Sequence, residues 1–302
     1  MAGDGALINL GDLSKPATVL IEKISDAVGG IAKPWQIERV AKAEAHAEII
    51  RAETKMQISE LERRAVLRLI RDEAFKQENI ESITAKAIPH LKEDAKPDKI
   101  EKDWLAHFFD RCKLISDAEM QSLWANILAK QANEPESFSK RTIELVASLD
   151  KSDAKAFSDL CAFSWVYVTG DGHASILIVP ELGKGLCEKH EINFQKLNHL
   201  DTIGLIKFGE LISYTMEKIE TLRLEYFGCP IELELLGKKQ FDLGKAWLTQ
   251  VGQQLVPICG AKPSQEYFRY QISQWHNQNY SLFCPIDAKE CWCKIAGYSV
   301  DL

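Results

Sequence analysis

Residues 193–206 have the sequence NFQKLNHLDTIGLI, and this stretch decides how the second half of the chain folds. Asn193 is a residue type that caps helix N-termini, because its side chain accepts a hydrogen bond from the first turn. Phe194, Leu197 and Leu200 follow at helical spacing. The stretch therefore predicts a short capped helix whose three apolar side chains pack inward.

The elements predicted around this helix follow in the order helix, strand, helix, helix and β ribbon. They are a helix at 153–165, a strand at 175–179, a helix at 180–190, the helix just described, and two alternating strands at 222–227 and 231–236. This order is that of a winged helix, a variant of the helix-turn-helix. Residues 197–206 and 248–255 also resemble segments of bacterial winged-helix regulators. We therefore predict a winged-helix-like module over 150–260 and a C-terminal extension over 261–302.

The first half of the chain is predicted to be helical. From Trp35 to Ala87 there is neither glycine nor proline, and good helix formers dominate, so residues 34–88 are predicted to form one long charged helix. Fifty helical residues would extend roughly 75 Å, so part of this helix must project or find a partner. Residues 1–33 are predicted to be a flexible tail followed by a short amphipathic helix.

A compact helical block is predicted over 99–149, with large aromatic residues such as Trp104 and Trp124 in its core. Ser139 and Arg141 lie where a helix begins and could bind an anion. A helix cap and a surface arginine are the simpler interpretation. The predicted fold class is α+β and mostly α, with a long N-terminal helix, a helical block and a winged-helix-like module.

The charge distribution favours a protein partner over nucleic acid. The chain has a net charge of -7, whereas nucleic-acid binders usually carry a basic excess. Only one lysine lies within 193–203, and the following ribbon is rich in glutamate. The candidate interaction residues on this helix are Gln195, Lys196, Asn198 and His199. A nucleic-acid-binding regulator that uses the same module is the alternative.

The eight cysteines are too dilute for a disulfide framework and favour reduced thiols in a cytoplasmic protein. Cys187 with His190, and Cys291 with Cys293, have spacings that occur in metal sites. A structural zinc site needs four ligands, usually as two tight pairs, and nothing in the sequence unites these pairs. We therefore predict no metal and no cofactor.

Catalytic motifs are absent from the sequence, including GxSxG, GxxxxGK[ST], GxGxxG and HExxH. Asp171 and His173 lie in a glycine-rich stretch typical of a turn. An enzyme of unrecognised type is therefore a minor alternative. No stretch approaches the ~20 apolar residues of a membrane span. A membrane-surface helix is a further alternative for the long helix. Residues 17–28 could contribute to it, although they lack the basic polar face of such helices.

A family resemblance rests on residues 100–145. The stretches that carry it are Asp103-Trp104, Phe108-Phe109, Leu123-Trp-Ala125, Ile127-Leu-Ala129, Phe138-Ser139 and Arg141-Thr142. They resemble an uncharacterised bacterial domain-of-unknown-function family over about residues 30–260, although Pro135-Glu136 stands where that family pattern has Pro-Gly. More loosely, the LWANILA segment is similar to the abortive-infection alpha family.

The resemblance implies a role in phage defence or stress response and supplies no catalytic residue. Together with the long helix, it leads to a non-enzymatic interaction protein, homo-oligomeric or bound to a protein partner, as the predicted function.

Overall fold

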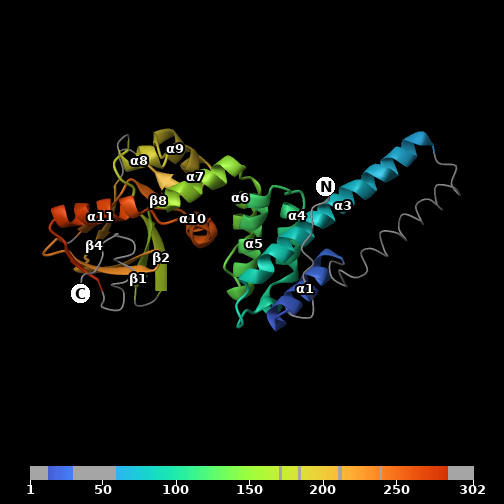
Figure 1. Cartoon of the computed structure of the whole chain (residues 1–302), viewed down its shortest axis with the longest axis horizontal. Helices are drawn as coiled ribbons and strands as arrows, with labels where there is room; N and C mark the ends of the chain where they lie inside the picture. Colours follow the sequence, from blue (N-terminus) through green and yellow to red (C-terminus); the bar gives the residue numbers. More distant parts are fainter. Residues whose placement is uncertain are drawn as a thin grey trace. The chain divides into compact units, whose positions relative to one another are not determined.

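The computed structural model describes residues 13–29, 59–169, 172–182, 185–209, 213–238 and 240–284 (Figure 1). The chain divides into two compact units between Ser148 and Leu149. We call them the helical unit and the sheet unit. The fold is mixed α+β. Predictions for residues 1–12, 30–58 and 285–302 lie outside the described residues.

The described part of the helical unit contains helices and two short 3₁₀ turns. These are α1 (Lys15–Val28), α3 (Glu60–Ala87), η2 (Ile88–His90), η3 (Pro97–Lys99), α4 (Lys102–Cys112), α5 (Ala118–Asn133) and α6 (Lys140–Ala147). Helix α3 packs along α5, while α1 and α6 both pack against α4. As predicted, Trp104 and Trp124 are buried, and each ring centroid lies 5.2 Å from that of Phe108. This aromatic cluster is the centre of the helical core.

Of the long helix predicted over 34–88, the structure describes residues 59–88. Within these residues Ser59 is not helical, because its backbone is extended with φ -64° and ψ 156°, and α3 begins at Glu60. The Ser59 N–H donates to Glu62 Oε2 at 2.7 Å, and the Glu62 N–H donates to Ser59 Oγ at 3.3 Å. This reciprocal capping box satisfies N–H groups that a helix start leaves unpaired. The S-x-x-E pattern of this capping box is present in the sequence at residues 59–62. The prediction of one long helix relied instead on the absence of glycine and proline.

The main sheet of the other unit has five antiparallel strands in the order β2-β1-β5-β6-β9. They are β1 (Ser164–Thr169), β2 (Gly172–Leu177), β5 (Thr221–Tyr226), β6 (Cys229–Glu234) and β9 (Ser281–Phe283). Two further pairs join β3 (Ile206–Phe208) to β8 (Ala246–Leu248) and β4 (Tyr214–Glu217) to β7 (Gln240–Gly244). The described helices of this unit are α7 (Lys151–Cys161), α8 (Leu186–Lys189), α9 (Phe194–Thr202), α10 (Gln250–Leu255), η4 (Val256–Ile258) and α11 (Gln265–Asn277).

Helix α11 lies over one face of the main sheet (Figure 1), where Trp165 of β1 forms the centre of the core. The Trp165 ring centroid lies 4.9 Å from those of Tyr226 and Trp275. The Trp165 Nε1–H donates to the Tyr267 hydroxyl at 2.8 Å, and that hydroxyl donates to the Ile178 carbonyl at 2.8 Å. Burial raises the pKa of Tyr226 to about 12 and the pKa of Tyr267 well above its usual value, so both hydroxyls keep their protons.

Several local predictions for the sheet unit are confirmed. The alternating strands predicted at 222–227 and 231–236 are β5 and β6. Asn193 caps α9, because its side chain accepts from the Lys196 N–H at 2.9 Å. These strands belong to the five-stranded sheet, however, and not to a separate two-stranded ribbon.

Two helix predictions in the sheet unit are wrong. The helix predicted over 153–165 ends at Cys161, and Trp165 lies in β1. The sequence from Ser164 is rich in β-branched and aromatic residues, which pack well in a strand buried between two neighbours. The helix predicted over 180–190 is confined to the four residues of α8.

Glu136 makes a turn in a backbone conformation that favours glycine. Its φ is 69°, in the left-handed region, where a side chain costs free energy that glycine avoids. The Ser137 N–H donates across this turn to the Glu134 carbonyl at 3.3 Å. A tight turn is therefore present at Pro135-Glu136, with glutamate in a conformation that usually belongs to glycine.

Candidate interaction surfaces

The residues predicted on α9 lie on its outer face. Gln195, Asn198 and His199 are exposed, whereas Lys196 is half-buried. Their placement follows from the burial of Leu197 and Leu200 on the opposite side of the helix.

Phe194 was predicted to pack inward, and this is wrong: its side chain is 47% exposed. Successive residues turn by about 100° around a helix, so Phe194 lies roughly 120° from Leu200 and reaches only the edge of the buried face. Its ring contacts Phe208 of β3, with centroids 5.6 Å apart.

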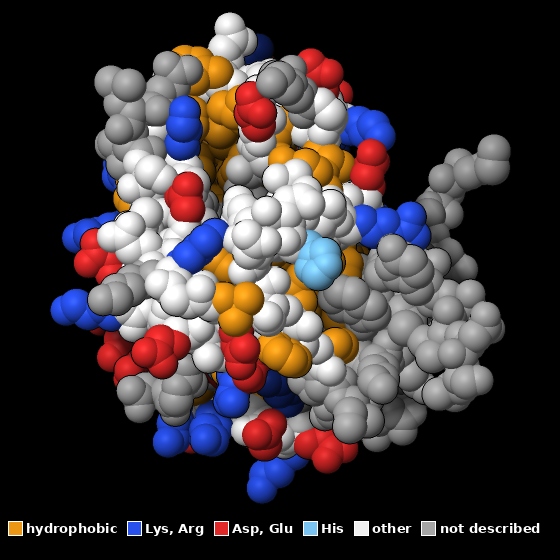
Figure 2. All heavy atoms as spheres, turned by 90° about the vertical axis from the view of Figure 1, so that its left-hand side faces the viewer, with side chains coloured by type: hydrophobic (Ala, Val, Ile, Leu, Met, Phe, Trp, Pro, Cys, Tyr) orange, Lys and Arg blue, Asp and Glu red, His pale blue; other side chains and the backbone are white. Residues whose placement is uncertain are grey.

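The cationic side chains of α9 and β3 are paired with carboxylates. Lys196 Nζ lies 3.1 Å from Glu191 Oε2, and this hydrogen bond lowers the pKa of Glu191. Lys207 Nζ lies 3.2 Å from Asp201 Oδ1. On the face drawn in Figure 2, acidic and basic side chains of the described residues are interspersed, without one continuous basic patch. Such a surface gives phosphate little electrostatic attraction.

His199 connects α9 to α7, because its Nε2 lies 2.8 Å from Asp153 Oδ1. The other oxygen of Asp153 accepts the Asp150 N–H at 3.0 Å, at the start of α7. Beside this contact, a surface hollow of about 490 Å³ is lined by Glu188, Glu191, Ile192, Asn193 and Lys196. The outer face of α9 is therefore polar, nearly neutral and fixed against α7.

Ser139 and Arg141 lie in the helical unit, so they do not belong to the α9 surface. Ser139 has the geometry of a helix cap: its Oγ accepts from the Thr142 N–H at 3.2 Å and lies 3.0 Å from Thr142 Oγ1. Arg141 is exposed on the first turn of α6. The simpler interpretation from the sequence, a cap and a surface arginine, accounts for both positions.

The N-terminal half of α3 carries large apolar side chains in solvent. It extends beyond the other helices of its unit (Figure 1). Leu61 is 69% exposed and Leu69 is 60% exposed, and Val66, Ile70 and Phe75 are also exposed. The sequence predicts association through this helix, and the structure shows which of its apolar side chains are exposed. We call residues 60–76 the arm.

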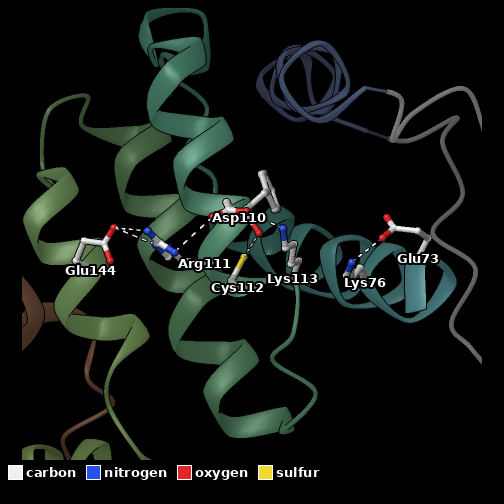
Figure 3. Close-up of polar contacts among 8 residues, drawn as sticks. Glu73, Lys76, Asp110, Arg111, Cys112, Lys113 and Glu144 are labelled. Carbon is white, nitrogen blue, oxygen red and sulfur yellow. Dashed lines mark hydrogen bonds and ion pairs between the residues drawn. The ribbon is translucent and has the colours of Figure 1, made fainter. Parts of the chain in front are cut away.

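The arm continues the face of α3 that is buried further along the helix. Residues seven apart lie on one face, so Leu69 is in line with Lys76 and with Ile83, which is fully buried. An ion pair between Lys76 and Glu73, drawn in Figure 3, separates the exposed apolar part of this face from the buried part and raises the pKa of Lys76. Leu69 therefore extends the packing face of α3 into the arm.

The other polar contacts in Figure 3 are structural. Arg111 on α4 pairs with Glu144 on α6 at 2.9 Å. Lys113 pairs with Asp110 and lowers the pKa of that carboxyl. Partly exposed ion pairs of this kind contribute about 0–1 kcal/mol. Burial raises the pKa of the neighbouring Cys112 far above that of a free thiol, which makes it a poor nucleophile.

Cys187 and His190, one of the two pairs weighed as metal ligands, have other partners. The Cys187 thiol donates to the Pro180 carbonyl at 3.4 Å, and burial raises its pKa to about 11. His190 Nε2 lies 3.2 Å from Ser264 Oγ. Over the described ranges, no three His, Cys, Asp or Glu side chains are grouped as metal ligands. Cys291 and Cys293 lie outside those ranges.

The fold and these surfaces define a mixed α+β protein that combines a helical unit bearing an exposed apolar arm with an antiparallel sheet unit. The sequence profile of DUF2806, described as a protein of unknown function, matches residues 63–271. The chain belongs to this family. The matched region begins within α3 and ends within α11, so it includes most of both units.

No curated protein and no solved structure matches the chain. Among the described helices, none combines the length and apolar character that crossing a bilayer requires.

Proposed function

We propose that the protein is a non-enzymatic, cytoplasmic interaction protein that self-associates through the arm of α3. The observation that carries this proposal is the row of exposed apolar side chains on the arm. Leaving several large apolar side chains in water forgoes about 1.5–3 kcal/mol for each one that could be fully buried. The looser resemblance to the abortive-infection alpha family supports a role in phage defence or stress response.

The sequence of the arm favours a second copy as its partner. When two arms pair antiparallel with Arg68 at the centre, residues whose numbers sum to 136 lie at the same height. On the helix face that points away from Arg68, this register places Val66 of each arm opposite Ile70 of the other. Apolar side chains therefore meet apolar side chains at the centre of the pairing. A twofold dimer of this kind is the commonest form of protein self-association.

The charges of the arm match in the same register. Arg63 lies opposite Glu73, and both flank the face that carries Val66 and Ile70. In the structure Arg63 pairs with Glu60 of its own helix at 2.9 Å, an exposed contact worth little. Exchanging this contact for one across the dimer therefore costs little. Opposite charges on the flanks of paired helices fix register and orientation.

The register gives a direct test. Arg63→Glu should weaken dimerisation at least about tenfold, because it places two like charges opposite each other at both ends of the pairing. Combining it with Glu73→Arg should restore the affinity. Arg71→Glu is the matched control, since residue 71 lies opposite Ala65 and the same charge change meets no acidic partner. Analytical ultracentrifugation of the full chain measures each dissociation constant.

Two outcomes would contradict the proposal. One is a wild-type chain that stays monomeric at all concentrations reached. The other is a pairing that the control weakens as much as Arg63→Glu does. Circular dichroism of each variant shows whether α3 keeps its helix.

The sheet unit supports a second part of the proposal, that α9 binds a protein. The winged-helix-like interpretation now rests on α7, α8 and α9 followed by the antiparallel pair β3–β8. Lys196 and Lys207, the cations of α9 and β3, are both paired with carboxylates. Phosphate would have to break these pairs.

We therefore expect duplex DNA to bind no tighter than the non-specific range of about 10⁻⁴–10⁻⁶ M at physiological salt. Fluorescence anisotropy with random duplex at two salt concentrations measures this binding. Tight, salt-resistant binding that Lys196→Glu abolishes would favour a nucleic-acid-binding regulator instead.

A further inference from the structure

A second surface hollow, of about 280 Å³, lies in the sheet unit and shares no lining residue with the hollow beside α9. Its described lining includes Val166 of β1, Glu225 of β5, Phe227 of the turn after β5, and Val256 of η4. Glu225 and Ser164 provide the only polar side chains in this lining. The volume is at the small end of the range for ligand pockets, roughly 300–1,000 Å³.

Strand register fixes where the Glu225 side chain lies. Its neighbours in β5, Leu224 and Tyr226, are buried on the side of the sheet that α11 covers, so Glu225 projects from the other side. Val166 of β1 and Pro230 of β6 are its direct cross-strand partners. Directly opposite residues project from the same face. The half-buried carboxylate therefore stands between two apolar side chains.

The Glu225 carboxylate has no ion-pair or hydrogen-bond partner among the described residues. The arginine on the same strand, Arg223, is engaged elsewhere, because its Nε donates to Glu232 at 2.9 Å. Removing a carboxylate from water costs free energy unless an opposite charge compensates it. A cation in the hollow would supply that charge.

Ser164 adds a second acceptor to the hollow. Its hydroxyl donates its proton to the Cys161 carbonyl at 2.6 Å, so toward a ligand the Ser164 oxygen has only lone pairs to offer. An ionised carboxylate is also an acceptor only. Both polar side chains of the lining therefore match a group that carries N–H donors and a positive charge.

Phe227 forms part of the wall in a backbone conformation that disfavours it. It occupies the two-residue turn between β5 and β6 together with Gly228, and their φ values are 47° and 84°. Positive φ at both positions defines a type I′ turn, for which Asn-Gly is the preferred pair. A bulky aromatic residue is exceptional there. The Phe227 ring contacts that of Tyr226, with centroids 4.9 Å apart, and is 37% exposed.

We propose that this hollow binds a small organic ammonium ion with an apolar body. The ammonium group donates to the Glu225 carboxylate and to the Ser164 oxygen, while the body packs against Val166 and Val256. The exposed ring of Phe227 covers the ligand and attracts its charge. The site is separate from the arm and adds a small-molecule ligand to the proposed interaction protein.

The ligand would account for the unfavourable turn. Strained backbone conformations persist where the side chain that they position has a function. Asparagine at position 227 would relieve the strain but would remove the aromatic ring from the hollow. Fold stability and ligand binding therefore favour different residues at this position, which a purely structural role would not explain.

The test uses the full chain with isotope-labelled valine methyl groups and phenethylammonium as the probe. Methyl NMR should show saturable shifts at Val166 and Val256, which line the hollow. Phenethyl alcohol has a similar shape without the charge. It should bind at least about tenfold more weakly, because it cannot form a charge-assisted hydrogen bond to Glu225.

Three variants separate the contributions. Glu225→Gln should weaken binding of the ammonium probe at least about tenfold and leave that of the alcohol nearly unchanged. Glu234→Gln is the matched control, because it removes the same charge from the same face of the sheet, outside the lining. Phe227→Asn should weaken binding by roughly fivefold. Its melting temperature should stay the same or rise, since Asn-Gly suits the turn.

Absence of saturable shifts at Val166 and Val256 at millimolar probe would overturn the proposal. Equal affinity for the ammonium ion and the alcohol would also overturn it, as would an equal loss in Glu234→Gln and Glu225→Gln. The first two results come from the wild type, so they remain decisive if a variant fails to fold. None of them depends on self-association of the arm.

Discussion

Trp165→Ala should lower the free energy of unfolding of the sheet unit by about 3–5 kcal/mol. The indole is almost fully buried, and its ring packs against Tyr226, Phe268 and Trp275. Removing it leaves a cavity that this ring cluster cannot easily fill, and the Tyr267 hydroxyl loses the donor at 2.8 Å. Urea denaturation followed by circular dichroism measures the change, and the melting temperature should fall by roughly 10 °C.

Two variants separate the causes of this loss. Trp165→Phe keeps a ring in the cavity but removes the Nε1–H donor, so it should cost less than the alanine variant. Trp247→Ala removes the same residue type from a half-buried position in β8 and should cost clearly less. If Trp247→Ala were as damaging as Trp165→Ala, the core of the unit would not be centred on β1.

Gly252→Ala should destabilise the sheet unit by about 1–3 kcal/mol, although the same change inside a helix usually stabilises by about 1 kcal/mol. Gly252 lies within α10, and a Cβ there would come within 2.1 Å of the Leu205 carbonyl oxygen. That oxygen is held by the Thr249 N–H at 3.1 Å and is part of the backbone, so it cannot swing away as a side chain would. The loss therefore follows from steric overlap that outweighs helix propensity.

Gln253→Ala is the matched control for this substitution. It lies beside Gly252 on the same helix, is half-buried, and also introduces the best helix former. It should leave the urea midpoint within a few tenths of a kcal/mol or raise stability slightly. A stabilising Gly252→Ala would mean that Leu205 and the start of β3 adjust without cost, and that α10 does not depend on this close approach.

Local patterns in the sequence predict the elements that local physics determines. Leu222, Leu224 and Tyr226 alternate with polar residues, and β5 is where that alternation places it. Asn193 caps α9 because the cap needs only a side chain and the next turn. The outer face of α9 follows from the burial of its leucines, so the polar candidates there were also predictable.

The features that sequence patterns miss depend on distant parts of the chain. No glycine or proline marks the end of α7 at Cys161, and β1 is stabilised by pairing with β2 and β5. The sequence marks Gly252 only as a weak helix former, because its close approach to the Leu205 carbonyl oxygen exists only in the folded structure. The exposure of the apolar side chains of the arm also depends on tertiary structure, because it is set by how much of α3 packs against the other helices of its unit.

The sequence separation of the core contacts also has a consequence for how the protein folds. The bond between Trp165 and Tyr267 spans 102 residues, whereas the bond between Trp104 and Phe138 in the helical core spans 34. Contacts between distant residues require the chain to close long loops before any stabilisation is gained, so folding slows as contact order rises. The helical unit should therefore acquire its structure before the sheet unit does. During that interval β1 and β5 have unpaired edges, which makes the newly synthesised sheet unit the part of the chain most dependent on chaperones.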